Sequence, residues 1–316
     1  MKELIEIINS RFDERTTSLE LQKRVWEAVA EYFRPDIRLY GSMRPSVILA
    51  RETGDLGLAV LWIVQAALAR PVLNDITAGI EDSDGIAPVT SCINEKTIVA
   101  LAHSEAADSP VTYSRGEDEV LLNGRTKFIT SGRNADMIMV TCREDGAPKI
   151  DSIALVRKSS LPPGSFSPLD LKIMRTVNHA GLALNNLALA NVQVPECDPA
   201  LIRRSIKKWG IIERALIIEA FPAFLLYCNY LFSEMNVTIA SDDEIIALLE
   251  RQSESAARQI EEAFSEKRIS TENAPMADLL KITGRFQKAF MEKEGDMPGE
   301  ERIRLADLFL FNSLKG

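Results

Sequence analysis

Hydrophobic and polar positions recur with two different periods along the chain, and the period changes twice. From residue 1 to about 103 the spacing of apolar residues is helical. The first predicted helix carries the apolar series Leu21, Val25, Val29 and Phe33, and a second helix is predicted over 46–69. From about 104 to 197, short β-rich runs alternate with turn-forming sequences. Asn123-Gly124, for example, is predicted to be a hairpin turn. Helical spacing then returns, with helices predicted near 199–235, 242–267, 275–292 and 299–313.

This order of elements predicts an α+β fold in three parts. A helical N-terminal domain would span 1–103, a central antiparallel β-domain 104–197, and a C-terminal helical bundle 198–316. Asp242-Asp243 is the expected cap of the second C-terminal helix, and Pro298-Gly299 precedes the last.

Composition and charge exclude several classes of protein. With 46% hydrophobic and 26% charged residues the chain is an ordinary globular protein, and a net charge of -9 without a basic run argues against nucleic acid as a partner. The four cysteines form no CxxC pair, so we expect neither a disulfide framework nor a zinc site, and a cytoplasmic location. The longest apolar run, 56–69, is interrupted by Gln65 and is shorter than the roughly 20 residues of a membrane span, which favours a buried helix.

Three segments carry a recognisable signature. Residues 119–136 read EVLLNGRTKFITSGRNAD, residues 102–105 read AHSE, and the segment that opens at Pro163-Gly164 contains KIMRT (172–176) and closes on NVQVP (191–195). These resemble, in the same order, the acyl-CoA dehydrogenase stretches Y-x-L-N-G-x-K-x-W-I-T-N-G, L-T-E-P and P-G-F…M-R-x-S/T…V-x-V-P. The match is close over about 90 residues. The chain is therefore similar to acyl-CoA dehydrogenases, as a member that is shortened or degenerate at its C-terminus.

The resemblance implies FAD as the cofactor. In the family, the aromatic residue of the W-I-T motif lies against the flavin ring and the threonine hydrogen-bonds near flavin N5. Carried over by position, the implied flavin contacts are Ser104, Phe128, Ile129 and Thr130. Taken alone, Phe128 would more often be a core residue and Thr130 an ordinary strand residue. The three segments in register favour the flavin role.

Several family elements are absent. The glycine-rich stretch that seats the pantetheine arm in the family is replaced by Ala106-Ala-Asp-Ser-Pro110, so the family's usual mode of CoA binding is not expected here. Residues 233–237 have neither the arginine nor the glycine of R-x-x-F-G. The segments Q-x-x-G-G-x-G and Y-E-G-T have no counterpart before Gly316.

The candidate catalytic base is Glu213. Some branches of the family place their glutamate in a segment similar to Gly210-Ile-Ile-Glu213-Arg214. Between Gly210 and Phe232 the only charged residues are Glu213, Arg214 and Glu219, so the helix is predicted to be buried and Glu213 to have a raised pKa. The alternative is a structural carboxylate with an ionic partner. Both histidines, His103 and His179, are expected to be ordinary strand or loop residues.

The leading functional hypothesis is an FAD-dependent dehydrogenase of an acyl thioester bound to CoA or to a carrier protein. One alternative is a degenerate structural subunit that pairs with a fuller paralogue, and another is a flavin-dependent oxidase or monooxygenase of the same fold. Apolar residues are crowded into 221–232 and 308–311, and an exposed surface of that kind would need a cover. We therefore expect a homodimer, or a heteromer with a paralogue.

Overall fold

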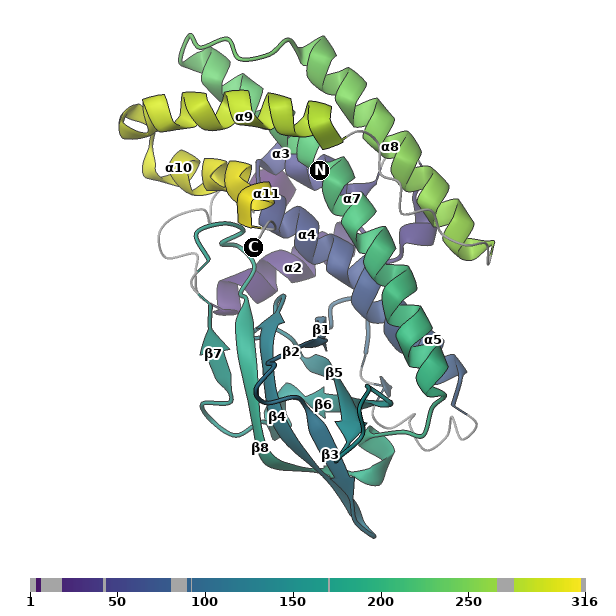
Figure 1. The fold of residues 1–316 in the computed structure, drawn as a ribbon. Helices are drawn as coiled ribbons and strands as arrows, with labels where there is room; N and C mark the ends of the chain where they lie inside the picture. The colour runs from purple at the N-terminus through teal and green to yellow at the C-terminus, as the bar shows by residue number, and fades with distance from the viewer. Residues whose placement is uncertain are drawn as a thin grey trace. The chain divides into compact units, whose positions relative to one another are not determined.

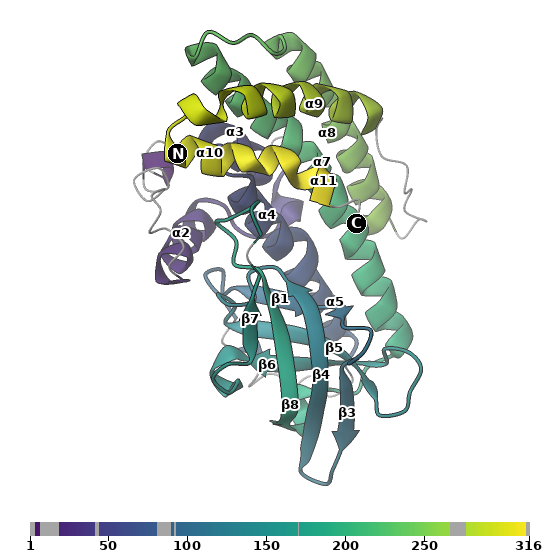
Figure 2. The same ribbon diagram turned by 60° about the vertical axis from the view of Figure 1, so that its left-hand side comes forward.

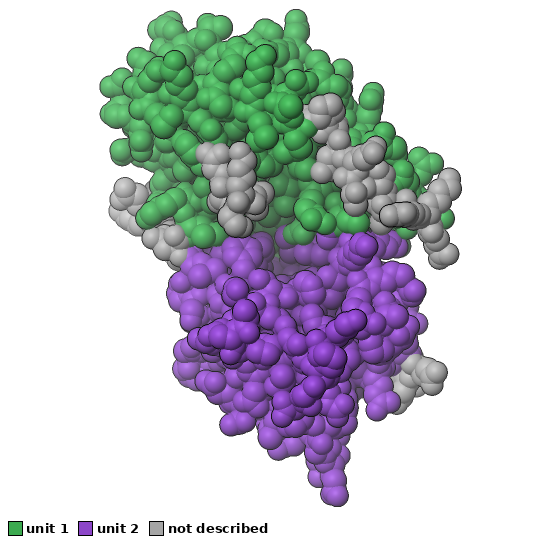
Figure 3. Space-filling view, viewed as in Figure 1, with its two compact units in different colours: residues 1–63, 171–177, 211–316 green, residues 64–170, 178–210 purple. Residues whose placement is uncertain are grey.

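The computed structural model describes residues 4–6, 19–41, 44–80, 90–91, 93–169, 171–265 and 276–313. Contacts divide the chain into two compact units, coloured in Figure 3. Unit 1 comprises 1–63, 171–177 and 211–316, and unit 2 comprises 64–170 and 178–210. Each unit therefore combines segments that are far apart in the sequence. The domain boundaries predicted at 103/104 and 197/198 remain predictions.

Unit 2 is built around an eight-stranded sheet (Figures 1 and 2). The strand order is β1-β5-β3-β4-β8-β7, with β2 paired to β4 and β6 paired to β5. The strands are β1 (Val99–Ala102), β2 (Ser104–Glu105), β3 (Thr112–Arg115), β4 (Glu119–Ile129), β5 (Met137–Glu144), β6 (Ser152–Arg157), β7 (Phe166–Pro168) and β8 (Ala180–Ala190). Most pairings are antiparallel, as predicted, but β1 and β3 both run parallel to β5.

Two local predictions in this sheet were wrong. Strand β1 lies in the zone that was predicted to be helical, because a short apolar run such as Ile98–Ala102 has no period to distinguish strand from helix. Asn123-Gly124 is a bulge inside β4 and not a hairpin turn: the register with β8 shifts there, and Gly124 has a φ of +121°. A Cβ at Gly124 would collide with the carbonyl oxygen of Pro110, so the position requires glycine for close approach as well as for its φ.

Helical segments of unit 2 pack against the sheet through Gln65. This fully buried residue opens a π-helical turn (Gln65–Ala69) that continues into α5 (Arg70–Ala78). Its side-chain amide donates to the carbonyl of Val99 at 2.8 Å and accepts from the Val99 amide at 2.9 Å. The one polar residue in the apolar run 56–69 is therefore a partner for the backbone of β1, since a buried amide needs hydrogen bonds on both of its ends.

Unit 1 is a helical assembly. Its helices are α2 (Leu19–Tyr32), α3 (Pro45–Thr53), most of α4 (Leu56–Val64), the greater part of α7 (Pro199–Glu234), α8 (Asp242–Phe264), α9 (Met276–Lys293), α10 (Gly299–Leu305) and α11 (Leu310–Ser313). The helices predicted near 199–235 and 275–292 are confirmed to within a residue at each described end. The helix predicted over 242–267 ends at Phe264, and residues 266–267 lie outside the described part of the chain. The helix predicted over 299–313 is divided by a 3-10 helix, Ala306–Phe309, into α10 and α11. The cap of α8 is Ser241, whose hydroxyl accepts from the Glu244 amide at 3.2 Å, while Asp242 and Asp243 occupy the first turn.

The helix predicted over 46–69 is interrupted. Helix α3 ends at Gly54, which adopts the left-handed conformation with a φ of +63°. Asp55 follows, and its carboxylate accepts the Leu58 amide at 2.9 Å, so α4 starts afresh. Hydrophobic periodicity runs through the break because both helices bury their apolar faces in the same core.

The apolar C-terminal residues pack against one another inside unit 1. Phe221 lies 4.5 Å from Phe311 between ring centroids, and Phe232 lies 6.0 Å from Phe286. These four rings are buried, whereas Tyr230 is 60% exposed. Most of the apolar residues on which the prediction of an oligomer was based are therefore covered within unit 1. The oligomer remains a prediction, but these residues no longer support it.

Two helical stretches, Leu56–Ala78 and Pro199–Glu234, are long and apolar enough to cross a bilayer by length and composition. Their most apolar windows are 83% and 61% buried inside the protein. Core helices pass the same test, so these properties alone are weak evidence for a membrane span.

Candidate functional site

Three of the four predicted flavin contacts lie on the paired strands β2 and β4 of unit 2, and the fourth, Thr130, directly follows β4. Ser104 of β2 pairs with Phe128 near the end of β4, and Ile129 pairs with Ala180 of β8. At the end of β4, where the register with β8 shifts between Thr126 and Ile129, Ile129 is completely buried and Phe128 is 36% exposed. Ile129 is therefore a core side chain, and Phe128 presents its ring at the surface.

A tight turn ends β4 directly after these residues. Thr130 is half-buried and lies just outside the strand. Ser131 has a backbone φ of 60°, which residues other than glycine rarely adopt. The amides of Asn134 and Ala135 donate to the Ser131 carbonyl at 2.9 and 2.8 Å, which holds the turn. The Ser131 hydroxyl is buried without a hydrogen-bond partner in the described part of the chain.

The Phe128 ring is backed by His179. The two rings stack with centroids 4.7 Å apart and planes 25° from parallel. His179 is 3% exposed, both ring nitrogens lack a hydrogen-bond partner among the described residues, and burial lowers its pKa to about 4. A neutral, buried imidazole thus fixes the inner face of Phe128. The sequence analysis missed this role, although the stacking partner follows the KIMRT motif by three residues.

Glu213, the candidate base, lies on α7 in unit 1. Its side chain is half-buried, and it makes no hydrogen bond or ion pair within the described residues. Burial raises the pKa of its carboxyl to about 7, against the opposing charge of Arg214. A carboxylate with a raised pKa, some solvent access and no competing partner has the properties of a general base.

Glu219, six residues further along α7, has a different environment. It is fully buried and forms an ion pair with Arg44, which is 3% exposed. Burial raises the pKa of Glu219 to about 7 as well, opposed chiefly by Arg44. The structure therefore separates the two glutamates of the apolar helix: Glu219 has the buried ionic partner of a structural carboxylate, and Glu213 does not.

The KIMRT segment is held inside unit 1 by two buried aspartic acid side chains. Asp55 accepts the Thr176 hydroxyl at 2.6 Å, and Asp307 accepts the Met174 amide at 2.5 Å. Met174 has a φ of 48°, and a Cβ at Gly57 would collide with the Thr176 hydroxyl. The loop therefore depends on glycine in α4 and on carboxyl groups that come from distant parts of the chain.

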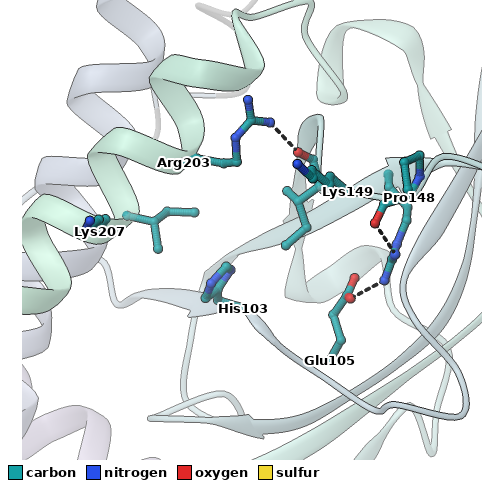
Figure 4. Close-up of a pocket in the computed structure, with 9 residues that line it drawn as sticks. His103, Glu105, Pro148, Lys149, Arg203 and Lys207 are labelled. Atoms are coloured by element: carbon teal, nitrogen blue, oxygen red, sulfur yellow. Dashed lines mark hydrogen bonds and ion pairs between the residues drawn. The ribbon is translucent and has the colours of Figure 1, made fainter.

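A charged pocket of about 430 Å³ opens elsewhere in unit 2 (Figure 4). Its lining comes from β2 and the residue before it, from the end of β5 and the hairpin that follows, and from the first turns of α7, and consists of His103, Glu105, Arg143, Pro148, Lys149, Ile150, Arg203, Ile206 and Lys207. Ser104 lies in sequence between two of these residues, but none of the four predicted flavin contacts is itself part of the lining. The pocket was not predicted, because three separate segments form it.

Hydrogen bonds fix the inner part of this pocket. Arg143 donates to Glu105 at 2.5 Å and to the carbonyl of Pro148 at 3.2 Å. Arg203 on α7 donates to the carbonyl of Ile150 at 2.9 Å and so ties the helix to the hairpin (Figure 4). His103 lies 3.2 Å from the Thr141 hydroxyl, and burial lowers its pKa while Glu105 opposes the shift. Within the described ranges, no group of three or more His, Cys, Asp or Glu side chains could hold a metal ion.

Comparison with known proteins defines the fold. No protein-family model matches the chain, and no curated sequence matches it. Among solved structures, butyryl-CoA dehydrogenase from Megasphaera elsdenii matches with a TM-score of 0.66 at 12% identity, over 98% of this chain and 92% of that one. The prolyl acyl carrier protein oxidase AnaB matches with a TM-score of 0.64 at 16% identity, over 97% and 92% of the two chains. PigA, in a structure with FAD and proline, matches with a TM-score of 0.61 at 14% identity, over 98% and 91%.

The chain therefore has the acyl-CoA dehydrogenase fold, shared with related flavoproteins. This result confirms the fold class and the resemblance that the three sequence segments indicated. At such low identity the comparison establishes the fold and leaves substrate and residue roles to the chemistry of the site.

Proposed function

We propose that this protein is an FAD-dependent oxidoreductase that dehydrogenates an acyl thioester. The observation that carries the proposal is the Phe128 ring, which is exposed on one side and backed on the other by the buried imidazole of His179. Large aromatic rings in a strand are usually buried, and an open ring with a fixed backing is a platform for a flat aromatic ligand.

The residues around Phe128 fit an isoalloxazine ring. Ser104 pairs with Phe128 across β2 and β4, and Thr130 follows β4 directly, so their hydroxyl groups would be available to the polar edge of a ring bound at Phe128. The buried Ser131 hydroxyl adds a polar group without a protein partner in the described region. A flavin ring has the apolar face and the polar edge that this arrangement would accept.

When bound, FAD supplies a hydride acceptor at N5 of its ring. Glu213 would act as the base: its carboxylate takes the α-proton of the acyl group, and the electron pair left on the α-carbon forms the double bond as hydride leaves the β-carbon. A base with a pKa of about 7 is half deprotonated at neutral pH and still basic enough to take the proton. The absence of an ionic partner for Glu213 among the described residues keeps this carboxylate available.

Flavin binding by purified protein tests the proposal. We expect visible flavin absorbance or uptake of added FAD, and Phe128→Ala should weaken FAD binding about tenfold because it removes the platform. Phe128→Trp should retain binding. Tyr230→Ala, at a residue that is 60% exposed on α7, is the control and should leave it unchanged. Failure of the wild-type protein to take up FAD would refute the proposal and leave the structural-subunit reading.

An oxidase is the second candidate, because one protein of the same fold is described as a prolyl acyl carrier protein oxidase. The two candidates differ in the final electron acceptor. Hydrogen peroxide formation from a thioester substrate in air would support an oxidase. Flavin reduction that persists in air and is relieved by an added electron acceptor would support a dehydrogenase.

A further inference from the structure

Two aspartic acid side chains of unit 1 meet at the start of α4. Asp55 directly precedes that helix, Asp307 lies in the 3-10 helix between α10 and α11, and each is 3% exposed. The backbone amide of Gly57 faces both carboxyl groups as a hydrogen-bond donor. Because one N–H reaches both groups, the two carboxyl groups lie close together, although they come from opposite ends of the chain.

Both carboxyl groups hold the same segment of backbone. Asp55 accepts the Thr176 hydroxyl at 2.6 Å, and Asp307 accepts the Met174 amide at 2.5 Å. The segment packs so closely on α4 that a Cβ at Gly57 would collide with the Thr176 hydroxyl. The two side chains therefore form a clasp on the KIMRT segment, and the residues that flank this segment in the chain belong to unit 2.

Two arginines lie near the pair, but its hydrogen bonds come from neutral groups. Burial raises the pKa of both carboxyl groups, and the charge of Arg304 opposes this rise at Asp55 as that of Arg175 does at Asp307. Nη1 of Arg304 donates to the Thr53 carbonyl at 3.0 Å and to a tyrosine hydroxyl at 2.7 Å. In the part of the chain that the structure describes, the two carboxyl groups accept from a hydroxyl and from backbone amides.

The other titratable neighbours keep their charge near neutral pH. Burial raises the pKa of Tyr227 to about 12 and that of the Cys228 thiol well above its usual value. Both therefore stay neutral between about pH 5 and pH 8. Glu301 on α10 adds negative charge near these two groups. Among the groups named here, the aspartic acid pair is the one whose protonation can change in that range.

Two buried carboxyl groups at this distance repel each other when both are ionised. Burial, with a smaller contribution from Asp55, raises the pKa of Asp307 from 3.8 to about 8. In an open segment both carboxyl groups would be hydrated, and both would be ionised above about pH 4. Closing the clasp at neutral pH therefore takes up a proton.

We propose that Asp55 and Asp307 form a proton-dependent clasp on residues 171–177, which holds this segment while the pair retains a proton and releases it when both groups are ionised. The sign follows from the proton balance. The stabilisation is complete below pH 3.8 and is lost as the pH rises to about 8, because the open state releases the proton that the closed state binds. One proton changes the ratio of closed to open segment by about tenfold per pH unit within this range. The clasp is thus a conformational device that responds to pH near neutrality.

Hydrogen exchange of a peptide that covers 171–177 tests the clasp in the whole protein. Protection factors correct for the intrinsic pH dependence of exchange, and local opening of the segment should determine them. In the wild-type protein, the protection factor should fall about tenfold from pH 6 to pH 7 and level off above about pH 8.

Three variants separate the pair from other sources of pH dependence. Asp307→Asn keeps an oxygen for the Met174 amide but does not titrate, so its protection factor should stay constant from pH 6 to pH 8. Asp55→Asn removes the neighbouring carboxyl group, so the fall should level off at a lower pH than in the wild type. Asp278→Asn changes the same charge at an exposed position of α9 and should follow the wild type.

Each contrary outcome would overturn the proposal. A wild-type protection factor that does not change between pH 6 and pH 8 would do so, and so would an equal fall in Asp307→Asn. If Asp307→Asn does not fold, Asp55→Asn decides, because a curve identical to that of the wild type would mean that the two groups do not act as a pair. A segment that is as strongly protected as the middle of α8 at every pH would show that it opens only when unit 1 unfolds, which also contradicts a local clasp.

Discussion

The polar groups of the two units are arranged in opposite ways. In unit 1, Asp55, Asp307 and Glu219 are buried and bonded to residues far away in sequence. In the unit 2 pocket, Lys149 and Lys207 stand open beside a fixed frame of hydrogen bonds. Buried polar groups need partners to offset their lost hydration, so the first set holds the fold. The second set remains hydrated and is available for a ligand.

Helix α7 carries both a buried carboxyl group with an ionic partner, Glu219, and one that no described residue bonds to, Glu213. Burial raises the pKa of Glu213 and of Glu219 to about 7 alike, so the pKa does not distinguish them. The partner does: Arg44 bonds to Glu219, and no described residue bonds to Glu213. A perturbed carboxylate thus indicates a functional site only where no structural partner explains it.

The largest expected effect is on catalysis. Glu213→Gln should slow flavin reduction by a thioester substrate by roughly 10²–10⁴-fold, because the amide cannot take the α-proton. The free energy of unfolding and the affinity for FAD should change little, since the substitution is nearly isosteric and breaks no hydrogen bond among the described residues. Stopped-flow absorbance with butyryl-CoA and with a prolyl carrier-protein thioester measures the rate. An unchanged rate would make Glu213 structural and erase the contrast with Glu219.

Next in size is the buried ion pair. Arg44→Met should lower the free energy of unfolding by about 3–5 kcal/mol, because it leaves the Glu219 carboxylate buried without its partner. Arg44→Met/Glu219→Leu should recover most of the loss. Arg251→Met, in an exposed pair with Asp278 at 3.5 Å, is the control and should cost about 1 kcal/mol or less. Chemical denaturation measures all three, and no recovery in the double variant would contradict this account.

A smaller effect is expected in the pH dependence of stability. Burial raises the pKa of Asp307 from 3.8 to about 8, so the folded state holds a proton that the unfolded state releases. The stability from this group is fully present below pH 3.8 and is lost as the pH rises towards about 8. Asp307→Asn keeps an oxygen for the Met174 amide and should lose less stability over this range. Denaturation at several pH values tests this, with Asp278→Asn, an exposed residue of α9, as the control. Parallel curves for wild type and Asp307→Asn would contradict the shift.

The sequence by itself determined most of the C-terminal helices and the class of fold. The C-terminal helices follow from hydrophobic spacing, which reflects the pitch of one helix and needs no information from elsewhere in the chain. The segment that we propose to contact the flavin was also identified from a short stretch of sequence. Phe128, Ile129 and Thr130 are consecutive and were identified from the motif alone, but the shift of register that leaves Phe128 exposed beside the buried Ile129 is visible only in the structure.

Only the tertiary structure decided which groups meet. Arg44 and Glu219 are 175 residues apart, and Met174 and Asp307 are 133 apart, so no local pattern could pair them. His179 behind Phe128, and the pocket drawn from residues 103–105, 143–150 and 203–207, are of the same kind. Secondary structure is set by short-range sterics and hydrophobic spacing, whereas partners across the core are selected by packing and by the need of every buried polar group for a hydrogen bond.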